Sequence, residues 1–543
     1  MKQLFHTALL LLATLLPMIA AAHDIEVDGI FYNINGNEAT VTYRGSYDSE
    51  YVEEYSGTVA IPASITHDGT TYAVTAIGYG AFFYCHDLTR VEIPNSITSI
   101  ASQIFKLCNS LKGITVASDN PYFDSRDNCN AIIETSSNIL MAGCQTTVIP
   151  ATIIAIGEAA FSGCMGLTSM NIPNSVKTIG ESAFAECWEL EDIGIPNSVT
   201  FIGSRAFSCC RIEHIEIPNS VTYIGDYAFF NSSLEHISLP NSITAIEECT
   251  FMGCSGLVSI GIPNSVTSIG DLAFGDCYVL TDVVIPNSVT AIGNEAFTST
   301  AWYENQPDGL IYAGLVLYKY KGEMPDGTDV VLRAGTLGIA DGAFDSCTGM
   351  TSIKLPHSLT NIGSNAFYRC IGLTALAIPS AVTAIGDGAF NSCSGLTCIA
   401  IPGAVTSIGE YAFCRCTGLT DVFCYATIPP VCKDNVFSSY EATLHVPDAS
   451  LDGYHTASCW KNFANIIGDA VEIVNGDVDM DGEIRINDVT KIINYLLTGD
   501  ATNINVENAD FDGNGKVNIA DVTTLIRHLL TLARYKDSNI KQL

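Results

Sequence analysis

Residues 257–277 read Leu257-Val258-Ser259-Ile260-Gly261-Ile262-Pro263-Asn264-Ser265-Val266-Thr267-Ser268-Ile269-Gly270-Asp271-Leu272-Ala273-Phe274-Gly275-Asp276-Cys277. The alternation Ile260-x-Ile262 is typical of a short, half-buried strand. Pro263 ends that strand because proline cannot donate to a β-ladder. Gly270 is expected to supply a backbone conformation that other residues resist. Phe274 then places a large side chain in the core.

The same unit recurs along most of the chain, every 22 or 23 residues where it is regular. A phenylalanine at the position of Phe274 in this unit occurs thirteen times, from Phe82 to Phe413. One such unit cannot bury its own apolar face, whereas a stack of them makes a continuous core, so the period predicts a β-rich solenoid. The strand-ending dipeptides are Ile93-Pro94, Ile172-Pro173, Ile195-Pro196, Ile217-Pro218, Leu239-Pro240, Ile262-Pro263, Ile285-Pro286, Leu355-Pro356, Ile378-Pro379 and Ile401-Pro402.

The repeat resembles the BspA-like leucine-rich-repeat family over roughly residues 75–425. The resemblance implies a β-rich α/β solenoid, with insertions at 117–148 and 301–335 that are either functional loops or structural spacers. We expect a signal peptide at 1–22, an N-terminal β cap at 23–75 and the solenoid at 76–425. A closing cap at 426–468, a linker at 469–474, a calcium module at 475–533 and a tail at 534–543 complete the predicted organisation.

Twenty cysteines in a chain that is expected to be exported first suggest disulfides. Most of them, however, lie three residues after a repeat Phe, and stacked coils are spaced too widely for a disulfide. The spacing therefore favours a ladder of buried thiols. The eleven positions are Cys85, Cys108, Cys164, Cys187, Cys210, Cys254, Cys277, Cys347, Cys370, Cys393 and Cys416.

The first residues and the net charge indicate an exported protein. Lys2 precedes an apolar run from Ala8 to Ile19, and small residues end at Ala22, as in a secretory signal peptide. The run is too short to span a bilayer, and we expect no membrane insertion. A formal net charge of -34 argues against binding nucleic acid, because phosphate binding depends on lysine and arginine. We therefore expect a secreted, extracellular or cell-surface location.

Two acidic loops near the C-terminus, 477–488 and 510–521, match the order of an EF-hand calcium loop, with Gly482 and Gly515 at its sharp turn. Position 12 is Asp in both loops, where EF-hands usually carry Glu. An apolar-periodic helix is expected after each loop. We predict two calcium ions, bound by Asp477, Asp479, Asp481, Glu483, Asp488, Asp510, Asp512, Asn514, Lys516 and Asp521.

Loop then helix, twice, resembles a type I dockerin. This resemblance implies non-covalent docking onto a cohesin-like module, and several well-known members carry Ser-Thr at the recognition positions. These recognition positions are loop positions 10 and 11, and neither loop carries Ser-Thr there, so the type of partner stays open. An intramolecular or cell-surface role of the module stays open as well. The predicted partner-reading residues are Ile486, Asn487, Ile519 and Ala520.

The sequence carries no Gly-x-Ser-x-Gly, Walker or His-Glu-x-x-His motif, although paired acids of a glycosidase leave no such motif. We therefore expect a non-enzymatic recognition or adhesion protein whose solenoid binds a protein or glycan ligand. An accessory component or enzyme of a polysaccharide-degrading assembly is one alternative, and a structural spacer is another.

The predicted ligand face consists of the residues between the inward-facing apolar positions of each strand. Loops on the opposite edge are the competing site. His214 and His236 occupy one outward repeat position, as a surface metal site or simply as exposed histidines. The predicted face reads Glu92, Asn171, Gly194, Glu216, Ser238, Gly261, Val284, Lys354, Ala377 and Ala400.

Overall fold

A computed structural model describes residues 23–44, 54–433, 435–470, 478, 485–501, 504, 506–511, 516–526 and 529. Contacts divide the chain into one unit of Met1–Pro263, Phe274–Val283 and Ser299–Ala301, and a second of Asn264–Ala273, Val284–Thr298 and Trp302–Leu543. The expected signal peptide, the tail and six predicted calcium ligands lie outside the described residues. Those ligands are Asp477, Asp479, Asp481, Glu483, Asp512 and Asn514.

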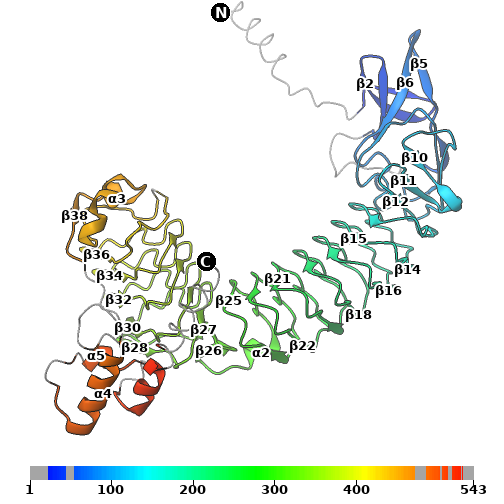
Figure 1. The fold of residues 1–543 in the computed structure, drawn as a ribbon. Helices are drawn as coiled ribbons and strands as arrows, with labels where there is room; N and C mark the ends of the chain where they lie inside the picture. Colours follow the sequence, from blue (N-terminus) through cyan, green and yellow to red (C-terminus); the bar gives the residue numbers. More distant parts are fainter. Residues whose placement is uncertain are drawn as a thin grey trace, which may run out of the picture. The chain divides into compact units, whose positions relative to one another are not determined.

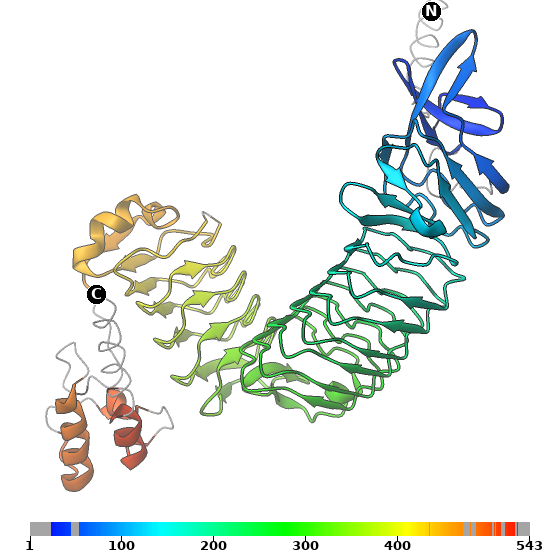
Figure 2. The ribbon, with the colours of Figure 1, turned by 45° about the vertical axis from the view of Figure 1, so that its right-hand side comes forward.

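Each regular coil contributes two short strands, and strands of successive coils pair in parallel (Figures 1 and 2). In the first row Met170 pairs with Ile193 and Ile215 with Ile237, so like side chains stack. This architecture confirms the predicted β-rich solenoid. The first row comprises β14 (Ser169–Asn171), β16 (Asp192–Gly194), β18 (His214–Glu216), β20 (His236–Ser238), β22 (Ser259–Gly261), β24 (Asp282–Val284), β28 (Thr328–Val331), β30 (Met350–Lys354), β32 (Ala375–Ala377), β34 (Cys398–Ile401) and β36 (Asp421–Cys424).

The second row consists mostly of two-residue strands that end in isoleucine. Ile156 pairs with Ile179 in the first unit, and Ile385 with Ile408 in the second. The row comprises β13 (Ala155–Ile156), β15 (Thr178–Ile179), β17 (Phe201–Ile202), β19 (Tyr223–Ile224), β21 (Ala245–Ile246), β23 (Ser268–Ile269), β25 (Ala291–Ile292), β29 (Gly338–Ile339), β31 (Asn361–Ile362), β33 (Ala384–Ile385) and β35 (Ser407–Ile408).

The repeat phenylalanines form a stacked column inside each unit. Phe251 and Phe274 stack with ring centroids 5.4 Å apart, and Phe274 is fully buried. In the second unit Phe367 and Phe390 stack at 5.1 Å, and the column continues to Phe437. Rings at this separation gain contact energy beyond the burial of their area.

The repeat cysteines are a thiol ladder, as the spacing predicts. Eighteen of the twenty cysteines are free. The Sγ of Cys187 donates to the carbonyl of Phe161, one coil earlier, at 3.1 Å, and that of Cys277 donates to Phe251 at 3.1 Å. Burial raises the pKa of the Cys277 thiol well above its usual range. The ladder therefore stays protonated and serves as a small hydrogen-bonding core residue.

The repeat glycine has a different role from the expected one. Neither Gly203 nor Gly270 is among the glycines with positive φ. Instead, a Cβ on Gly203 would lie 2.6 Å from the backbone nitrogen of Glu181 in the preceding coil. Glycine is needed because the coils approach closely, and the prediction of an unusual backbone conformation was wrong.

Left-handed backbone occurs instead two residues before and two after the core Phe of each coil. Around Phe184, Ser182 has a φ of 53° and Glu186 a φ of 61°. The N–H groups of Ser182, Phe184 and Glu186 each donate to a carbonyl of the next coil at 2.8 Å. This third ladder offsets the cost of left-handed conformations in residues other than glycine.

The two insertions are hairpins whose second strand joins the parallel ladder. In 117–148, β11 (Ala131–Glu134) pairs antiparallel with β12 (Ile139–Gly143), and β12 pairs parallel with β13. In 301–335, β26 (Gly309–Ala313) and β27 (Val316–Lys321) form the same arrangement against β29. The stack has about 17 turns, more than the thirteen marked by the Phe position, and β12 and β27 belong to two of the additional turns.

Strands also make up the segment before the first coil. They form a sheet in the order β1 (Ile25–Val27), β2 (Ile30–Asn35), β3 (Glu38–Thr42), β6 (Thr70–Ile77) and β5 (Ser64–His67), with β8 (Ser99–Ile100) on β6. A separate parallel sheet holds β4 (Gly57–Ala60), β7 (Leu88–Ile93) and β9 (Gly113–Val116), and β10 (Phe123–Asp124) pairs with β11.

After the last regular coil, β37 (Thr443–His445) and β38 (Asn465–Ile467) extend the sheet of β36 in parallel. The segment also contains α3 (Leu451–Thr456) and a buried Trp460. A disulfide joins Cys432 and Cys459, which the repeat spacing did not predict.

Among the described residues no helix has both the length and the apolar character required to cross a membrane.

Candidate binding sites on the strand row and the helical module

In the first unit, the outward position of the strand row is exposed. Glu92, Asn171, Gly194, Glu216, Ser238 and Gly261 all face solvent, while the residues on either side point largely inward. No atom lies within 4 Å of where a Cβ would stand on Gly194 or Gly261, so the surface there is open. A partner backbone could approach these two positions closely.

In the second unit the row extends beyond the predicted residues. Val284 is 61% exposed, and Lys354 pairs in register with Val331, which is 64% exposed. Ala400, which is half-buried, pairs with Phe423, and Phe423 pairs with His445. Val331, Phe423 and His445 were missed because their strands lack the regular marker, Ile-Pro followed by the next repeat.

Phe423 and His445 stack with ring centroids 4.2 Å apart. The His445 ring lies between two carboxylates, 2.8 Å from Asp469 and 3.2 Å from Asp421. Hydrogen bonds from Thr420 and His445 lower the pKa of Asp421. This end of the row therefore offers an aromatic surface held in a fixed orientation by charged neighbours.

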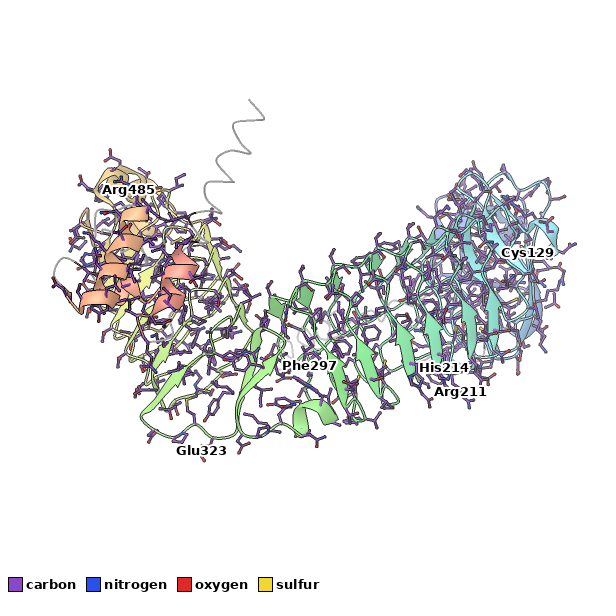
Figure 3. The ribbon with its side chains drawn as sticks, turned by 60° about the horizontal axis from the view of Figure 1, so that its bottom comes forward. Cys129, Arg211, His214, Phe297, Glu323 and Arg485 are labelled. Carbon is purple, nitrogen blue, oxygen red and sulfur yellow. A yellow bond between two sulfur atoms is a disulfide. The ribbon has the colours of Figure 1, made fainter. Side chains whose placement is uncertain are left out.

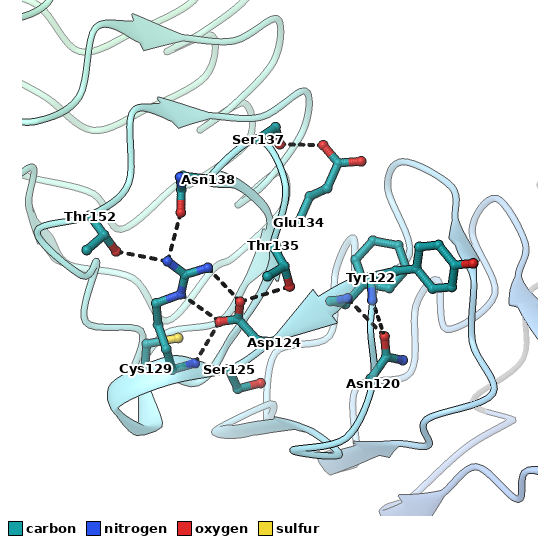
Figure 4. A network of polar contacts seen from close by, with 12 residues as sticks. Asn120, Tyr122, Asp124, Ser125, Cys129, Glu134, Thr135, Ser137, Asn138 and Thr152 are labelled. Atoms are coloured by element: carbon teal, nitrogen blue, oxygen red, sulfur yellow. Dashed lines mark hydrogen bonds and ion pairs between the residues drawn. The ribbon is translucent and has the colours of Figure 1, made fainter.

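Arg126 organises the first insertion through polar contacts with Asp124 and Asn138, which are labelled in Figure 4. Its guanidinium lies 2.6 Å from the carboxylate of Asp124 and 2.7 Å from the side-chain oxygen of Asn138. Burial alone would raise the pKa of Asp124, but hydrogen bonds from Arg126 and Thr135 hold it below its usual value. These bonds link β10 to the turn between β11 and β12.

The helical module has a small core of its own. Val478, Val489, Ile492, Ala509, Val522 and Leu525 pack together. Helix α4 (Ile486–Thr498) ends at Gly499, whose left-handed backbone and N–H bond to Tyr495 close the helix. The second half contains α5 (Val506–Ala509) and a helical stretch at 519–526.

The two position-12 aspartates of the predicted calcium loops are buried, Asp488 at 1% and Asp521 at 0% exposure. Both oxygens of Asp488 accept backbone N–H groups at 2.7 Å, from Val478 and Arg485. Asp521 accepts the equivalent bond from Asn518 at 2.7 Å. Of the other predicted ligands in the described part, Asp510 is partly exposed and Lys516 exposed.

Calcium fits this donor set. Each loop offers several carboxylate and amide oxygens, and Ca²⁺ takes six to eight oxygen ligands. A buried carboxylate is costly in free energy unless donors or a cation compensate it, and both position-12 aspartates are held in place by backbone donors. The two loops share Asp at positions 1, 3 and 12 and Gly at position 6, which predicts one ion in each.

The predicted partner-reading positions are exposed at the start of each helix. Ile486 and Ile519 are both 69% exposed, and Asn487 and Ala520 also face solvent. Both isoleucines are therefore accessible to a partner.

Family comparisons agree with this division of the chain. The BspA type leucine rich repeat region matches residues 64–144, 140–257, 222–305 and 326–443, and the dockerin type I domain matches residues 475–530. Dockerin type I domains generally bind calcium and cohesin partners. No curated protein matches the chain.

Several solved structures are similar to the chain. A leucine-rich repeat protein from Bacteroides ovatus is 26% identical over 74% of this chain and 94% of its own, with a TM-score of 0.31. A leucine rich cell surface protein from Faecalibacterium prausnitzii is 27% identical over 74% and 94%, with a TM-score of 0.29. The pneumococcal vaccine antigen PcpA is 17% identical over 83% and 100%, with a TM-score of 0.29. The BspA type leucine rich repeat family model matches more than half of this chain. The chain therefore belongs to the BspA type leucine-rich-repeat family and carries a type I dockerin domain near its C-terminus.

Proposed function

We propose that this protein is an exported, non-catalytic binding protein with two separate attachments. The strand row of the solenoid binds a protein or glycan ligand, and the dockerin domain, loaded with two calcium ions, attaches the chain to a cohesin-like partner. The observation that carries the second attachment is the pair of exposed isoleucines, Ile486 and Ile519, at equivalent positions of the two half-domains.

The experiment is a binding assay of the full chain against a panel of cohesin modules, with calcium and with chelator. We expect calcium-dependent binding to at least one module. The double variant Ile486→Asp/Ile519→Asp should lose it, because either half could present its own isoleucine to the partner. Leu497→Asp is the matched control, since Leu497 is 78% exposed on the same helix but at its far end.

Equal binding by the double variant would remove these isoleucines from the interface. Calcium-dependent folding without binding to any cohesin would instead favour a role of the domain on the cell surface.

Participation in a polysaccharide-degrading assembly is the alternative, and the dockerin domain is the feature that favours it. In that case the chain is an accessory component or itself an enzyme. Reducing sugar released from a glycan panel, and abolished by a single Asp or Glu substitution, would make it an enzyme.

A further inference from the structure

We propose that His214, His236 and Glu235 form a transition-metal site on the outer surface of the first unit, of the class that binds Zn²⁺. The site is independent of the calcium loops. Among the described residues these three are the one group of three or more His, Cys, Asp or Glu side chains whose candidate ligand atoms all lie within 4.8 Å of one another. All three side chains are exposed (His214 is labelled in Figure 3).

The parallel register places the two histidines together. His214 pairs directly with His236 across β18 and β20, and their rings stack with centroids 5.3 Å apart and planes 14° from parallel. The strands fix the two backbones, so the imidazoles are held close before any ion binds. Such preorganisation lowers the entropic cost of binding.

A bend in the chain adds the carboxylate. The N–H groups of Glu235 and His236 both donate to the carbonyl of Glu213, at 2.9 and 3.2 Å. Two consecutive residues thus face a single partner residue, and both side chains point outward instead of alternating. The same pair of hydrogen bonds recurs one coil earlier, where the N–H groups of Glu191 and Asp192 both donate to the carbonyl of Thr168.

The geometry therefore repeats along the solenoid, whereas the ligand chemistry does not. In the coil before, Glu191 is engaged by Arg211 at 3.1 Å, and in the coil after, the histidine position is Ser259. Only at β18 and β20 does the bend bring two imidazoles and a carboxylate together.

The donor set selects the metal. Imidazole suits Zn²⁺ and its neighbours, whereas Ca²⁺ takes oxygen ligands. Tetrahedral Zn²⁺ with bonds near 2.0–2.1 Å needs ligand atoms about 3.3 Å apart. Because the three side chains are exposed, small rotations can bring them from within 4.8 Å to that spacing. Three protein ligands leave a fourth position for water or for a donor from a bound partner.

The test is calorimetric titration of the full chain with ZnCl₂, with calcium saturating the dockerin loops and a reductant present. We expect one added site. His214→Ala and His236→Ala should each weaken it at least about tenfold, since the loss of a residue that only hydrogen-bonds to a metal ligand already costs about that much. His67→Ala, which removes a surface histidine elsewhere on the unit, should leave the affinity unchanged.

Zinc binding to the eighteen free thiols is the competing outcome. Titration with Co²⁺ separates the two, because thiolate ligands add an intense sulfur-to-metal charge-transfer band that imidazole and carboxylate do not. We expect a spectrum without that band, lost in the His214→Ala/His236→Ala variant. An unchanged affinity in that double variant, or a thiolate spectrum, overturns the proposal. Unchanged melting of the metal-free variant would show that the fold is intact.

Discussion

At the scale of single residues, the core is a set of columns in which one residue type repeats at one position. Phe274 shows why each member matters: it is fully buried, stacks on Phe251, and lies beside the thiol ladder. A smaller side chain would leave a cavity in this close-packed core, because three sets of backbone hydrogen bonds hold neighbouring coils at a fixed spacing.

Phe274→Ala should therefore lower the free energy of unfolding by roughly 3–5 kcal/mol, as for other buried phenylalanines. Tyr278→Ala is the matched control, because Tyr278 is 60% exposed and should change stability by less than about 0.5 kcal/mol. Urea unfolding of the two variants makes the comparison. Equal stabilities would show that the ring column does not hold the solenoid together.

A second column consists of acidic residues, and one of them, Asp341, works against stability at neutral pH. The carboxylates of Asp271, Asp341 and Asp387 each accept a backbone N–H from a following coil, at 2.6 to 2.7 Å. Burial raises the pKa of Asp341 to about 6, with the charges of Asp271 and Asp387 adding to it and the bond from Ser364 opposing it.

The sign of the resulting pH dependence follows from proton binding. Between about pH 4, the ordinary range of an aspartate, and about pH 6, folded Asp341 keeps a proton that the unfolded chain has lost. This residue therefore makes stability fall as pH rises through that window. Asp341→Asn keeps the acceptor and should add on the order of 2 kcal/mol at pH 7, but nothing below about pH 4.

Urea unfolding at both pH values, with the exposed Asp326→Asn as control, measures this difference. A gain that is the same at both pH values would attribute the effect to something other than titration of Asp341.

At the scale of elements, the sequence pattern predicted what depends on side-chain periodicity. Ile260-x-Ile262 is a strand, Phe274 is core, and the cysteine position is a thiol ladder. It could not predict what depends on the neighbouring coil. The left-handed residues beside Phe184 are Ser182 and Glu186, which carry no turn signature, because their conformation is imposed by the ladder between coils.

The insertions show the same limit. Their sequences predict insertions between coils, but only pairing in three dimensions shows that β12 and β27 serve as strands of the stack. The outward residues of the row were read from alternation alone, and their exposure is what alternation requires. The sequence did not predict that Phe423 and His445 lie on the row, because the Ile-Pro dipeptide that marks the outward position in other coils is absent there.

The calcium loops allow a test on one element at a time. Asp488→Ala or Asp521→Ala removes a buried carboxylate, proposed as a calcium ligand, that backbone N–H groups hold in place. We expect the full chain to bind two calcium ions and each variant one, by calorimetric titration. At free calcium about 100 times the dissociation constant, each site adds about 2.7 kcal/mol to the stability of the domain. Fewer than two ions in the unmodified chain would show that one loop is misassigned.

At the scale of the whole molecule, the proposed function assigns two tasks to two parts of the chain. Stacked coils bury their core columns and leave one position per strand outside the core, so that position can vary, as from Glu216 to Gly261, without disturbing the packing. The dockerin domain has its own core and its own exposed residues, and it contacts the strand row through Lys354, whose Nζ lies 3.7 Å from a carboxylate oxygen of Asp510.

This separation predicts that ligand binding can be abolished without loss of stability. Ser238 is exposed, and Gly261 has an open surface above it and no positive φ, so arginine fits at both positions. Ser238→Arg/Gly261→Arg should abolish binding to host-cell or matrix ligands, because two long charged side chains would then cover the flat part of the row. Its melting temperature should equal that of Tyr278→Arg, a control that adds one charge outside the row and should bind normally. If the double variant binds fully, and substitutions in the 301–335 hairpin abolish binding instead, the ligand site lies on the insertion and the strand row is only scaffold.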